Sequence, residues 1–402
     1  MRVMRAHGRS FVWLVLSLGC ATRDAPVRPG IDVLVADSIH LVAGRRVGLL
    51  TNQSGRGADG VDDVTLLLAA GVDLRAIFSP EHGFRGVLDQ ENIGHHTDSA
   101  TGLPVYSLYG AERQPTAEQL ATIDVLLVDL QDIGARTYTY VSSALTAYRA
   151  ATDHDVAVIV LDRPNPIGGE TIQGPMLDTA FASWVGMVPV PLRHGMTIGE
   201  LLRWGVATGG TRGNLTVIPV AGWKRSMWYD DTGLPWVRPS PNIPDLESAT
   251  HYSGLVMFER TNLSVGRGTP LAFQVIAAPW LDARALADDL SGVAGVTARD
   301  TVIRPAASTD HKYDGMTVAA VRLAVTDRAA YDPVRLAVAV LAFVQAHHGD
   351  SLVFQARGFD ERAGSDRVRL AVAAGVAAER IAAEWADALT RFRRSRTPFL
   401  LY

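Results

Sequence analysis

A glutamate and a histidine, Glu81 and His82, stand side by side directly after an apolar run of the sequence. The run, 72–78, is typical of a buried strand, and the proline and glycines around the pair are expected to end that strand and bend the chain. Open α/β sheets bind their ligands at the ends of strands. A carboxylic acid held there, partly shielded from water, is suited to general acid catalysis. We therefore expect Glu81 to be catalytic with His82 beside it; the alternative is a glutamate that caps a turn.

Polar side chains follow two further apolar runs, 123–130 and 156–161, that also read as buried strands. Strand ends converge in a doubly wound sheet, so these side chains could line one crevice. The segment 137–152 is expected to be helical, so the side chains of Tyr138 and Tyr140 should diverge and at most one should face the site. The polar residues in question are Asp129, Asp132, Arg136, Tyr138, Asp162, Arg163 and Asn165.

The elements that position these residues alternate between strand and helix from about residue 31 to 220. Such alternation predicts an α/β domain with a mostly parallel sheet covered by helices on both faces. A Pro- and Trp-rich stretch at 222–250 closes this domain, which we place at 31–250. The pattern then becomes α+β, so 251–402 is expected to be a second, smaller domain. Its predicted strands are 254–259, 272–277, 296–303 and 317–325, and its predicted helices are 331–347 and 372–393.

The composition is that of an ordinary globular chain, with 402 residues of which 48% are hydrophobic and 20% charged. A net charge of −4 gives no basic surplus, so a nucleic-acid partner is not expected. After the N-terminus, no apolar run reaches the roughly 18 residues that a membrane-spanning helix needs.

The N-terminus has the pattern of an export signal. Arg2, Arg5 and Arg9 precede an apolar stretch that ends at Cys20, the only cysteine of the chain. The end of this stretch resembles a bacterial lipoprotein signal, in which the cysteine becomes the lipidated first residue; an ordinary cleaved signal is the alternative. We expect a signal at 1–20, a tether at 21–30, and a protein in the periplasm or on the cell surface that contacts the membrane only through its lipid anchor.

Several classes of site are not supported by the residue spacing. The chain lacks the His-Glu-x-x-His and His-x-His spacings of metal sites and the Gly-x-Ser-x-Gly of serine hydrolases. Gly48 and the Gly55/Gly57 pair are not expected to form a dinucleotide-binding loop. No metal or cofactor is therefore expected. The remaining inventory is carboxylates with aromatic and arginine binding groups, which suits glycoside hydrolysis.

These same segments resemble the bacterial exo-β-N-acetylmuramidases, a NamZ-like family. The similarity covers 49–55, 79–86, 129–140, 161–169, 174–175, 193–200, 239–244, 261–269 and 399–402. It implies an enzyme that removes β-linked N-acetylmuramic acid from the non-reducing end of peptidoglycan fragments. It also implies a Rossmann-like N-terminal domain, a smaller C-terminal domain, an active site in the cleft between them, and Glu81 as the key catalytic glutamate. Thr137 and Arg260 depart from the family pattern, which usually has an aromatic residue and a glycine there.

Muramic acid carries a lactyl carboxylate, and a guanidinium pairs with a carboxylate bidentately. Arg267 and Arg136 are the first candidates, followed by Arg85 and Arg163, although each could instead form a structural ion pair. Tyr138, Asn165 and Asn242 are further candidate contacts with the sugar; each asparagine could instead form an Asx turn.

The identity of the second catalytic group is not decided by the sequence: it is either one of several carboxylates or a group of the substrate itself. Asp132 is our first candidate, beside Asp129, Asp162 and Glu259, and the acetamido oxygen of the substrate is the alternative. A second function, from another class, is a non-catalytic lipoprotein that binds peptidoglycan fragments in the same cleft.

Overall fold

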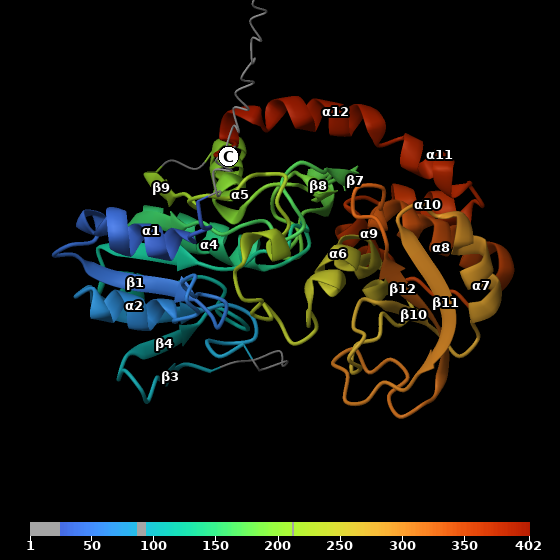
Figure 1. The fold of residues 1–402 in the computed structure, drawn as a ribbon, viewed down its shortest axis with the longest axis horizontal. Coiled ribbons are helices and arrows are strands. Elements are labelled where there is room, and N and C mark those ends of the chain that lie inside the picture. Colours follow the sequence, from blue (N-terminus) through green and yellow to red (C-terminus); the bar gives the residue numbers. More distant parts are fainter. Residues whose placement is uncertain (1–24, 87–93, 211–212) are drawn as a thin grey trace, which may run out of the picture.

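The computed structural model describes residues 25–86, 94–210 and 213–402. Within these residues, seven strands form the sheet of the N-terminal domain in the order β3-β4-β2-β1-β5-β6-β9 (Figure 1). All neighbours are parallel except β3, which is antiparallel to β4. The strands are β1 Arg46–Thr51, β2 Asp73–Ser79, β3 His96–Thr97, β4 Pro104–Ser107, β5 Val125–Asp129, β6 Ala157–Leu161 and β9 Leu215–Ile218.

The six parallel strands follow the Rossmann order, third-second-first-fourth-fifth-sixth, so the direction of winding changes between β1 and β5. The predicted α/β class with a mostly parallel sheet is confirmed. Ligands of such sheets bind beyond the carboxyl ends of the strands near this switch, which is where the loops after β2 and β5 lie.

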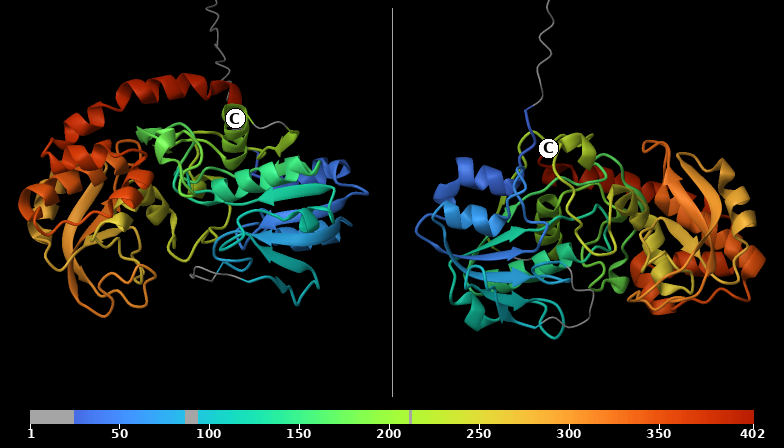
Figure 2. Two further views of the ribbon diagram at one scale, coloured as in Figure 1. Left: turned by 180° about the vertical axis from the view of Figure 1, so that it is seen from behind. Right: turned by 60° about the horizontal axis from the view of Figure 1, so that its bottom comes forward.

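Helices cover both faces of this sheet, and the apolar side chains of its strands alternate between them. Leu49 packs with residues of α1 (Gly30–Asp37) and α2 (Asp63–Ala69) on one face. Leu50 packs with residues of α4 (Tyr140–Asp153) and α5 (Ile198–Gly209) on the other. Figure 2 shows the arrangement of the helices around the sheet from two further sides. Burial on both sides explains why the strands read as continuous apolar runs.

The smaller C-terminal domain has an antiparallel sheet in the order β10-β12-β11, as expected for an α+β unit. Its strands are β10 Val275–Ala277, β11 Val296–Ile303 and β12 Val318–Val325. Helices α7 (Ala283–Asp289) and α8 (Pro333–His348) pack on this sheet, and α6 (Leu246–Leu255) contacts α8 at the boundary with the first domain (Figure 1).

The chain ends by returning to the N-terminal domain. Helix α12 crosses from the C-terminal domain toward α5, where Phe392 packs edge-on against Trp204 at a ring-centroid distance of 5.3 Å (Figures 1 and 2). The last residue, Tyr402, reaches the end of β6. The helices on this path are α9 Ala356–Ala363, α10 Arg367–Ala373, α11 Ala378–Ala383 and α12 Ala386–Ser395.

Short elements complete the fold. The strands β7 Gln173–Met176 and β8 Pro191–Arg193 form a two-stranded sheet between the domains, and α3 spans Ala117–Leu120. The 3-10 turns are η1 Ile39–Leu41, η2 Thr179–Phe181, η3 Tyr229–Thr232, η4 Val256–Arg260, η5 Leu290–Gly292 and η6 Thr397–Phe399.

Two elements of the C-terminal half differ from the predictions. The segment 254–259 is not a strand but the end of α6 and the turn η4. It is buried on most sides, and an apolar run of that kind does not distinguish a strand from a helix. The segment 372–393 is not one helix: Gly375, with a φ of 68°, ends the turn after α10, and α11 and α12 follow separately.

The predicted tether is shorter than expected. Arg28 pairs with Ala221 as an antiparallel bridge, Val27 is buried, and the Gly30 amide donates to the Asp162 carbonyl over 2.8 Å. A Cβ on Gly30 would lie 2.4 Å from the Asp162 nitrogen, so this close approach requires glycine. The chain is therefore part of the folded N-terminal domain from Val27 onward. The predicted signal and Cys20 lie outside the described residues.

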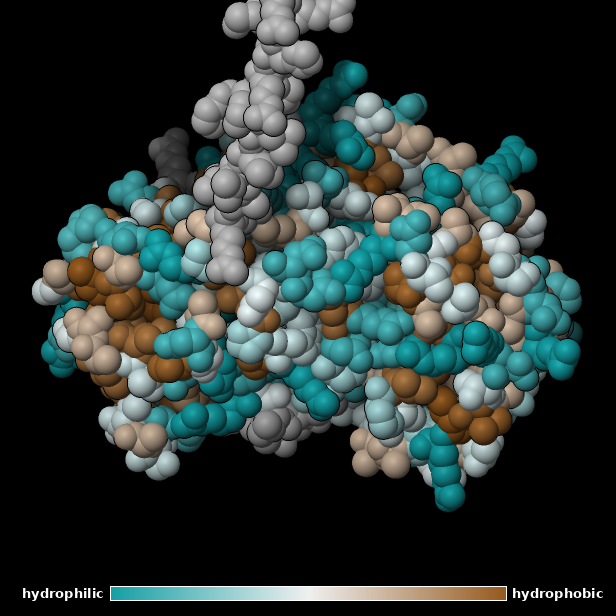
Figure 3. Space-filling model, viewed as in Figure 1, coloured by the Kyte–Doolittle hydropathy of each residue, from teal (hydrophilic) through white to brown (hydrophobic). Residues whose placement is uncertain are grey.

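Among the described residues, no helix is both long and apolar enough to cross a bilayer. On the face drawn in Figure 3, hydrophilic side chains are spread over both domains with hydrophobic ones between them. Such a mixed surface is usual for a globular protein.

Candidate active site

A cavity between the two domains is lined by five of the residues predicted to act on or bind the substrate, and by Glu259, one of the further carboxylate candidates. We call it the inner chamber, and Glu81, His82, Tyr138, Asn242 and Arg267 all line it. Its empty volume, including space that is open to solvent, is about 610 Å³. The other lining residues are Thr137, Thr139, Tyr140, Val185, Ser240, Ile243, Tyr252, Val256, Glu259, Phe273 and Arg362.

Glu81 is positioned by a sharp turn after β2. His82 and Gly83 both adopt left-handed backbone conformations, with φ of 71° and 73°, directly after the glutamate. A non-glycine residue in this region is energetically unfavourable and often occurs at functional sites. The turn leaves Glu81 half-buried, and its Oε2 accepts a 2.7 Å hydrogen bond from the Thr139 hydroxyl. The carboxyl group therefore has a defined orientation in the chamber.

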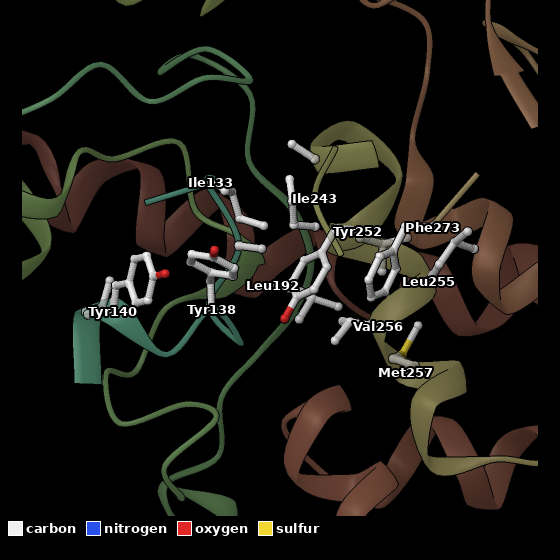
Figure 4. Close-up of a cluster of buried hydrophobic side chains, with 14 of the residues drawn as sticks. Ile133, Tyr138, Tyr140, Leu192, Ile243, Tyr252, Leu255, Val256, Met257 and Phe273 are labelled. Carbon is white, nitrogen blue, oxygen red and sulfur yellow. The ribbon is translucent and has the colours of Figure 1, made fainter. Parts of the chain in front are cut away.

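Four aromatic rings form a row across the chamber, from Tyr140 and Tyr138 of the N-terminal domain to Tyr252 and Phe273 (Figure 4). Successive ring centroids are 4.8, 5.9 and 4.7 Å apart. Burial raises the pKa of all three tyrosines, so their hydroxyls stay protonated. Such a surface offers both apolar ring faces and neutral hydroxyls to a ligand.

The row of rings corrects one prediction. Both Tyr138 and Tyr140 face the chamber, whereas a helical spacing would have directed only one of them there. The reason is that α4 begins at Tyr140, so Tyr138 lies in the turn before the helix. The Tyr140 hydroxyl donates to the Pro239 carbonyl, and the Tyr252 hydroxyl donates to the Thr137 carbonyl over 3.4 Å.

A carboxylate shared by two arginines forms another part of the chamber wall. Arg267 donates to Oε1 of Glu259 through Nε, at 3.0 Å, and through Nη2, and Arg362 donates through Nε to Oε2 at 3.2 Å. Burial opposes ionisation of Glu259, but the two guanidinium groups outweigh it and lower its pKa to about 2. Glu259 is therefore ionised at neutral pH, and the three side chains together carry one net positive charge.

A second cavity continues from the inner chamber, and we call it the outer chamber. It shares Glu81, Glu259, Arg267 and Arg362 with the inner one and has an empty volume of about 1490 Å³. Its remaining walls are Tyr109, Arg260, residues 307–312 and Gln355. The group at Glu81 thus lies where the two chambers meet.

Two of the predicted arginines form ion pairs elsewhere. The exposed Arg85 pairs with Asp98 at 2.6 Å. Arg163 is buried, and its Nη2 donates to Asp129 over 2.8 Å. Neither arginine lines the inner or the outer chamber, and neither does Asp129. Both arginines therefore form structural ion pairs, which is the alternative that we gave for them from the sequence.

Arg136 joins segments of the two domains rather than lining the chambers. Its Nη1 donates to the carbonyls of Pro175 and Val190, and its Nη2 donates to that of Arg362, each at 2.9 Å. Burial lowers the pKa of Arg136 to about 9, which still leaves it charged at neutral pH. We therefore withdraw Arg136 as a candidate for the substrate carboxylate.

Three other predicted residues are also used within the fold. Asp132 is buried, accepting from the Gly134 amide at 2.7 Å and lying 3.5 Å from Nε2 of His194. Asn165 forms an Asx turn with Ile167 and also donates to Met196. Asp162 accepts from Thr197, Gly199 and Tyr402 at 2.6–2.9 Å. None of these three lines the inner or outer chamber, so Asp132 is not a partner of Glu81.

Sequence reasoning missed Thr139, Tyr252 and Arg362 as members of the site. Thr139 lies inside a segment that we singled out, but nothing in its spacing indicated a hydrogen bond to Glu81. Tyr252 and Arg362 come from α6 and α9, for which the sequence carried no functional motif. Within the described part of the chain, no three His, Cys, Asp or Glu side chains are grouped to hold a metal ion.

Comparisons with known proteins identify similar sequences and structures for both domains. Residues 47–247 match the family model "exo-beta-N-acetylmuramidase NamZ, N-terminal", and residues 250–402 match its C-terminal counterpart. The peptidoglycan beta-N-acetylmuramidase NamZ of Bacillus subtilis (strain 168) is 38% identical over 381 residues, which cover 94% of this chain and 91% of that protein.

Two crystal structures of DUF1343 family proteins from Bacteroides fragilis NCTC 9343 have the same fold. One is 34% identical with a TM-score of 0.87, and the other is 30% identical with a TM-score of 0.73. Each alignment covers 94% of this chain and 99% of the other. The chain belongs to the exo-β-N-acetylmuramidase NamZ family.

Proposed function

We propose that this protein is an exo-acting glycoside hydrolase that releases β-linked N-acetylmuramic acid from the non-reducing ends of peptidoglycan fragments, with Glu81 as the general acid. The observation that carries the proposal is the Glu81 carboxyl group, oriented by Thr139 in a chamber that also holds Arg267 and Arg362. The name of the Bacillus subtilis relative, a peptidoglycan beta-N-acetylmuramidase, supports the substrate class.

Glu81 supplies the proton that the leaving group needs. In its protonated form it donates to the glycosidic oxygen as the bond to the anomeric carbon breaks, so the leaving sugar departs as a neutral alcohol. The hydrogen bond from Thr139 holds the carboxyl group in one orientation. Less conformational entropy is then lost on reaching the transition state.

The lactyl carboxylate of muramic acid is recognised by Arg267 and Arg362. Both guanidinium groups line the chamber, and a guanidinium pairs with a carboxylate through parallel hydrogen bonds, so we assign these two side chains to the lactyl carboxylate. This arrangement distinguishes muramic acid from N-acetylglucosamine, which has no carboxylate. Tyr138 and Asn242 line the same chamber, and we assign them contacts with the sugar ring and its N-acetyl group.

The nucleophile is the acetamido oxygen of the substrate. Glu259 is the one member of our four carboxylate candidates that shares the chamber with Glu81, but both its oxygens accept from guanidinium groups and its pKa is about 2. Such a carboxylate is a weak base and nucleophile.

Attack by the acetamido oxygen forms a cyclic intermediate, and water activated by Glu81 then opens it. Two displacements give a product of retained anomeric configuration, which NMR of the first-formed sugar tests; an inverted product would exclude this route.

We also propose that the enzyme faces the periplasm or the outer surface of the cell on a lipid anchor at Cys20. This proposal rests on the basic residues and apolar stretch that precede Cys20. Because Val27 is packed into the domain, residues 21–26 would let the enzyme extend at most about 25 Å from the acylated cysteine. Intact mass spectrometry of native protein tests the anchor: we expect an N-terminal Cys20 carrying acyl chains, and an unmodified N-terminus at another residue would contradict it.

Hydrolysis of a chromogenic β-N-acetylmuraminide, compared with the matching glucosaminide, tests the proposed activity. We expect release of the chromophore from the muraminide and little from the glucosaminide. Folded protein that binds the muraminide without turnover would support the alternative, a non-catalytic lipoprotein that binds peptidoglycan fragments.

A further inference from the structure

The two chambers differ in what they can hold. The inner chamber is smaller and lined by the aromatic row, whereas the outer chamber has more than twice its empty volume and continues away from Glu81. A general acid must lie beside the glycosidic oxygen, with one sugar on either side of it. The inner chamber therefore suits the terminal sugar, and the outer chamber suits the part of the substrate that leaves.

The wall of the outer chamber that belongs to the C-terminal domain carries more positive than negative charge. Arg260, Arg267, Arg362 and Lys312 line it together with the carboxylates of Glu259 and Asp310. Lys312 is fixed: its amine donates to the carbonyls of Phe258, Glu259 and Leu263 at 2.9–3.1 Å and lies 3.8 Å from Asp310.

Arg260 differs from the other cations of this wall in its exposure and its partner. Its side chain is exposed, and Nη1 donates over 3.1 Å to the uncharged amide oxygen of Gln355. Burial and then the charge of Arg362 lower the pKa of Arg260, which indicates that the guanidinium groups repel one another. An uncompensated concentration of charge in a cleft costs stability and attracts ligands of the opposite sign.

We propose that the outer chamber binds a carboxylate carried by the leaving part of the substrate, and that Arg260 is the side chain that pairs with it. The inference rests on the proposed function. The carboxylate has two chemical sources in a peptidoglycan fragment: the lactyl group of a second muramic acid, or the stem peptide attached to that group. Tyr109 of the N-terminal domain also lines the outer chamber, and an aromatic side chain suits a sugar that lies between Glu81 and this carboxylate.

The test compares kcat/KM for release of the terminal muramic acid from three trisaccharides. They end in a second muramic acid whose lactyl group is a free carboxylate, a neutral methyl amide, or a peptide bearing its own carboxylates. We expect one or both anionic substrates to be preferred over the neutral one by roughly three- to tenfold, less so at high salt. The preferred substrate identifies the source.

Variants assign the preference to Arg260. In Arg260→Gln the ratio of anionic to neutral kcat/KM should fall close to one, whereas Arg260→Lys should keep part of it. Arg357→Gln is the matched control, because Arg357 is an exposed arginine of the same domain that pairs with Glu361 at 2.7 Å and lines neither chamber; its ratio should equal that of the wild type.

Two results would overturn the inference while leaving the proposed function intact: equal kcat/KM for the three substrates in the wild-type enzyme, or an unchanged preference in Arg260→Gln. Failure to release muramic acid from any of the three substrates would instead contradict the proposed function, and the inference with it.

Discussion

The hydroxyl of Thr139 donates a 2.7 Å hydrogen bond to the carboxylate of Glu81, which lies 58 positions earlier in the chain. One residue follows β2 and the other follows β5, and both strands are parallel neighbours of β1. The sheet thus brings the acid and its orienting group together at its carboxyl edge. The contact connects the topology of the domain directly to the chemistry that we propose.

Replacing Thr139 by valine tests the importance of this contact. The change preserves size but removes the hydroxyl, so the Glu81 carboxyl group loses its fixed orientation. We expect kcat to fall by about tenfold or more, in line with the usual strength of a hydrogen bond to a charged group. Thr139→Ser should retain most of the activity. Equal kcat values for the valine variant and the wild type would show that the hydrogen bond does not position the acid.

Arg267→Gln should lose the preference for muraminide over glucosaminide. The guanidinium group lines the chamber, and without it Arg362 alone remains to bind the lactyl carboxylate. We expect the ratio of kcat/KM for the two chromogenic substrates to fall by roughly tenfold or more. A ratio equal to that of the wild type would exclude Arg267 as a reader of the carboxylate.

Arg136→Gln provides the contrasting case, because Arg136 donates to three carbonyls and its own side chain lines neither chamber. Its loss leaves buried carbonyl groups without donors, so we expect the free energy of unfolding to drop by about 2–4 kcal/mol in urea titrations. The muraminide preference of the remaining folded enzyme should stay as in the wild type. A changed preference with unchanged stability would reverse the roles that we assign to the two arginines.

The ion pairs of Glu259 predict a pH dependence of stability. The pKa of Glu259 falls from 4.5 to about 2 on folding, so its contribution is fully present above pH 4.5 and is lost as the pH drops toward 2. This shift corresponds to about 3 kcal/mol. Wild type and Glu259→Gln, unfolded by urea across this range, should therefore differ most above pH 5 and converge near pH 2. A difference that is independent of pH would contradict the assigned shift.

Tyr402, the C-terminal residue, is expected to stabilise the fold through hydrogen bonds to residues that are distant from it in the sequence. The Tyr402 hydroxyl donates to the buried Asp162 at 2.7 Å and accepts from the Val220 amide at 2.9 Å. Tyr402→Phe leaves both groups without this partner, which should lower the free energy of unfolding by roughly 1–3 kcal/mol. Tyr313→Phe, which removes a hydroxyl that donates to the Asn262 carbonyl in the C-terminal domain, allows comparison with an unrelated tyrosine. No loss of stability in Tyr402→Phe would show that the tail is not anchored through its hydroxyl.

The sequence was most informative about the N-terminal sheet. The apolar runs at 123–130 and 156–161 became β5 and β6, because strands covered on both faces must be apolar at every position. The same reasoning failed at 254–259, where a helix end is buried just as completely. Apolar content alone does not distinguish these two cases.

The site was predictable where a residue follows a strand and unpredictable where its partner comes from far away. Glu81 and His82 could be located from the strand that precedes them. For the arginines, the sequence did not reveal which groups they contact. Arg163 donates to Asp129 and Arg136 donates to three carbonyls. Arg267, in contrast, lines the chamber. Arg362 completes the site from α9, and only the packing of the two domains brings it there.

The most direct test of the central claim is the turnover of a β-N-acetylmuraminide with an activated phenol leaving group and of the natural disaccharide by Glu81→Gln. The amide has nearly the shape of the acid but cannot donate the proton. We expect the variant to fold and bind like the wild type while kcat on the disaccharide falls by about 10²–10⁴-fold. The phenol, which needs less protonation to leave, should be affected less. Near-normal turnover of the disaccharide by Glu81→Gln would remove Glu81 as the general acid and contradict the mechanism.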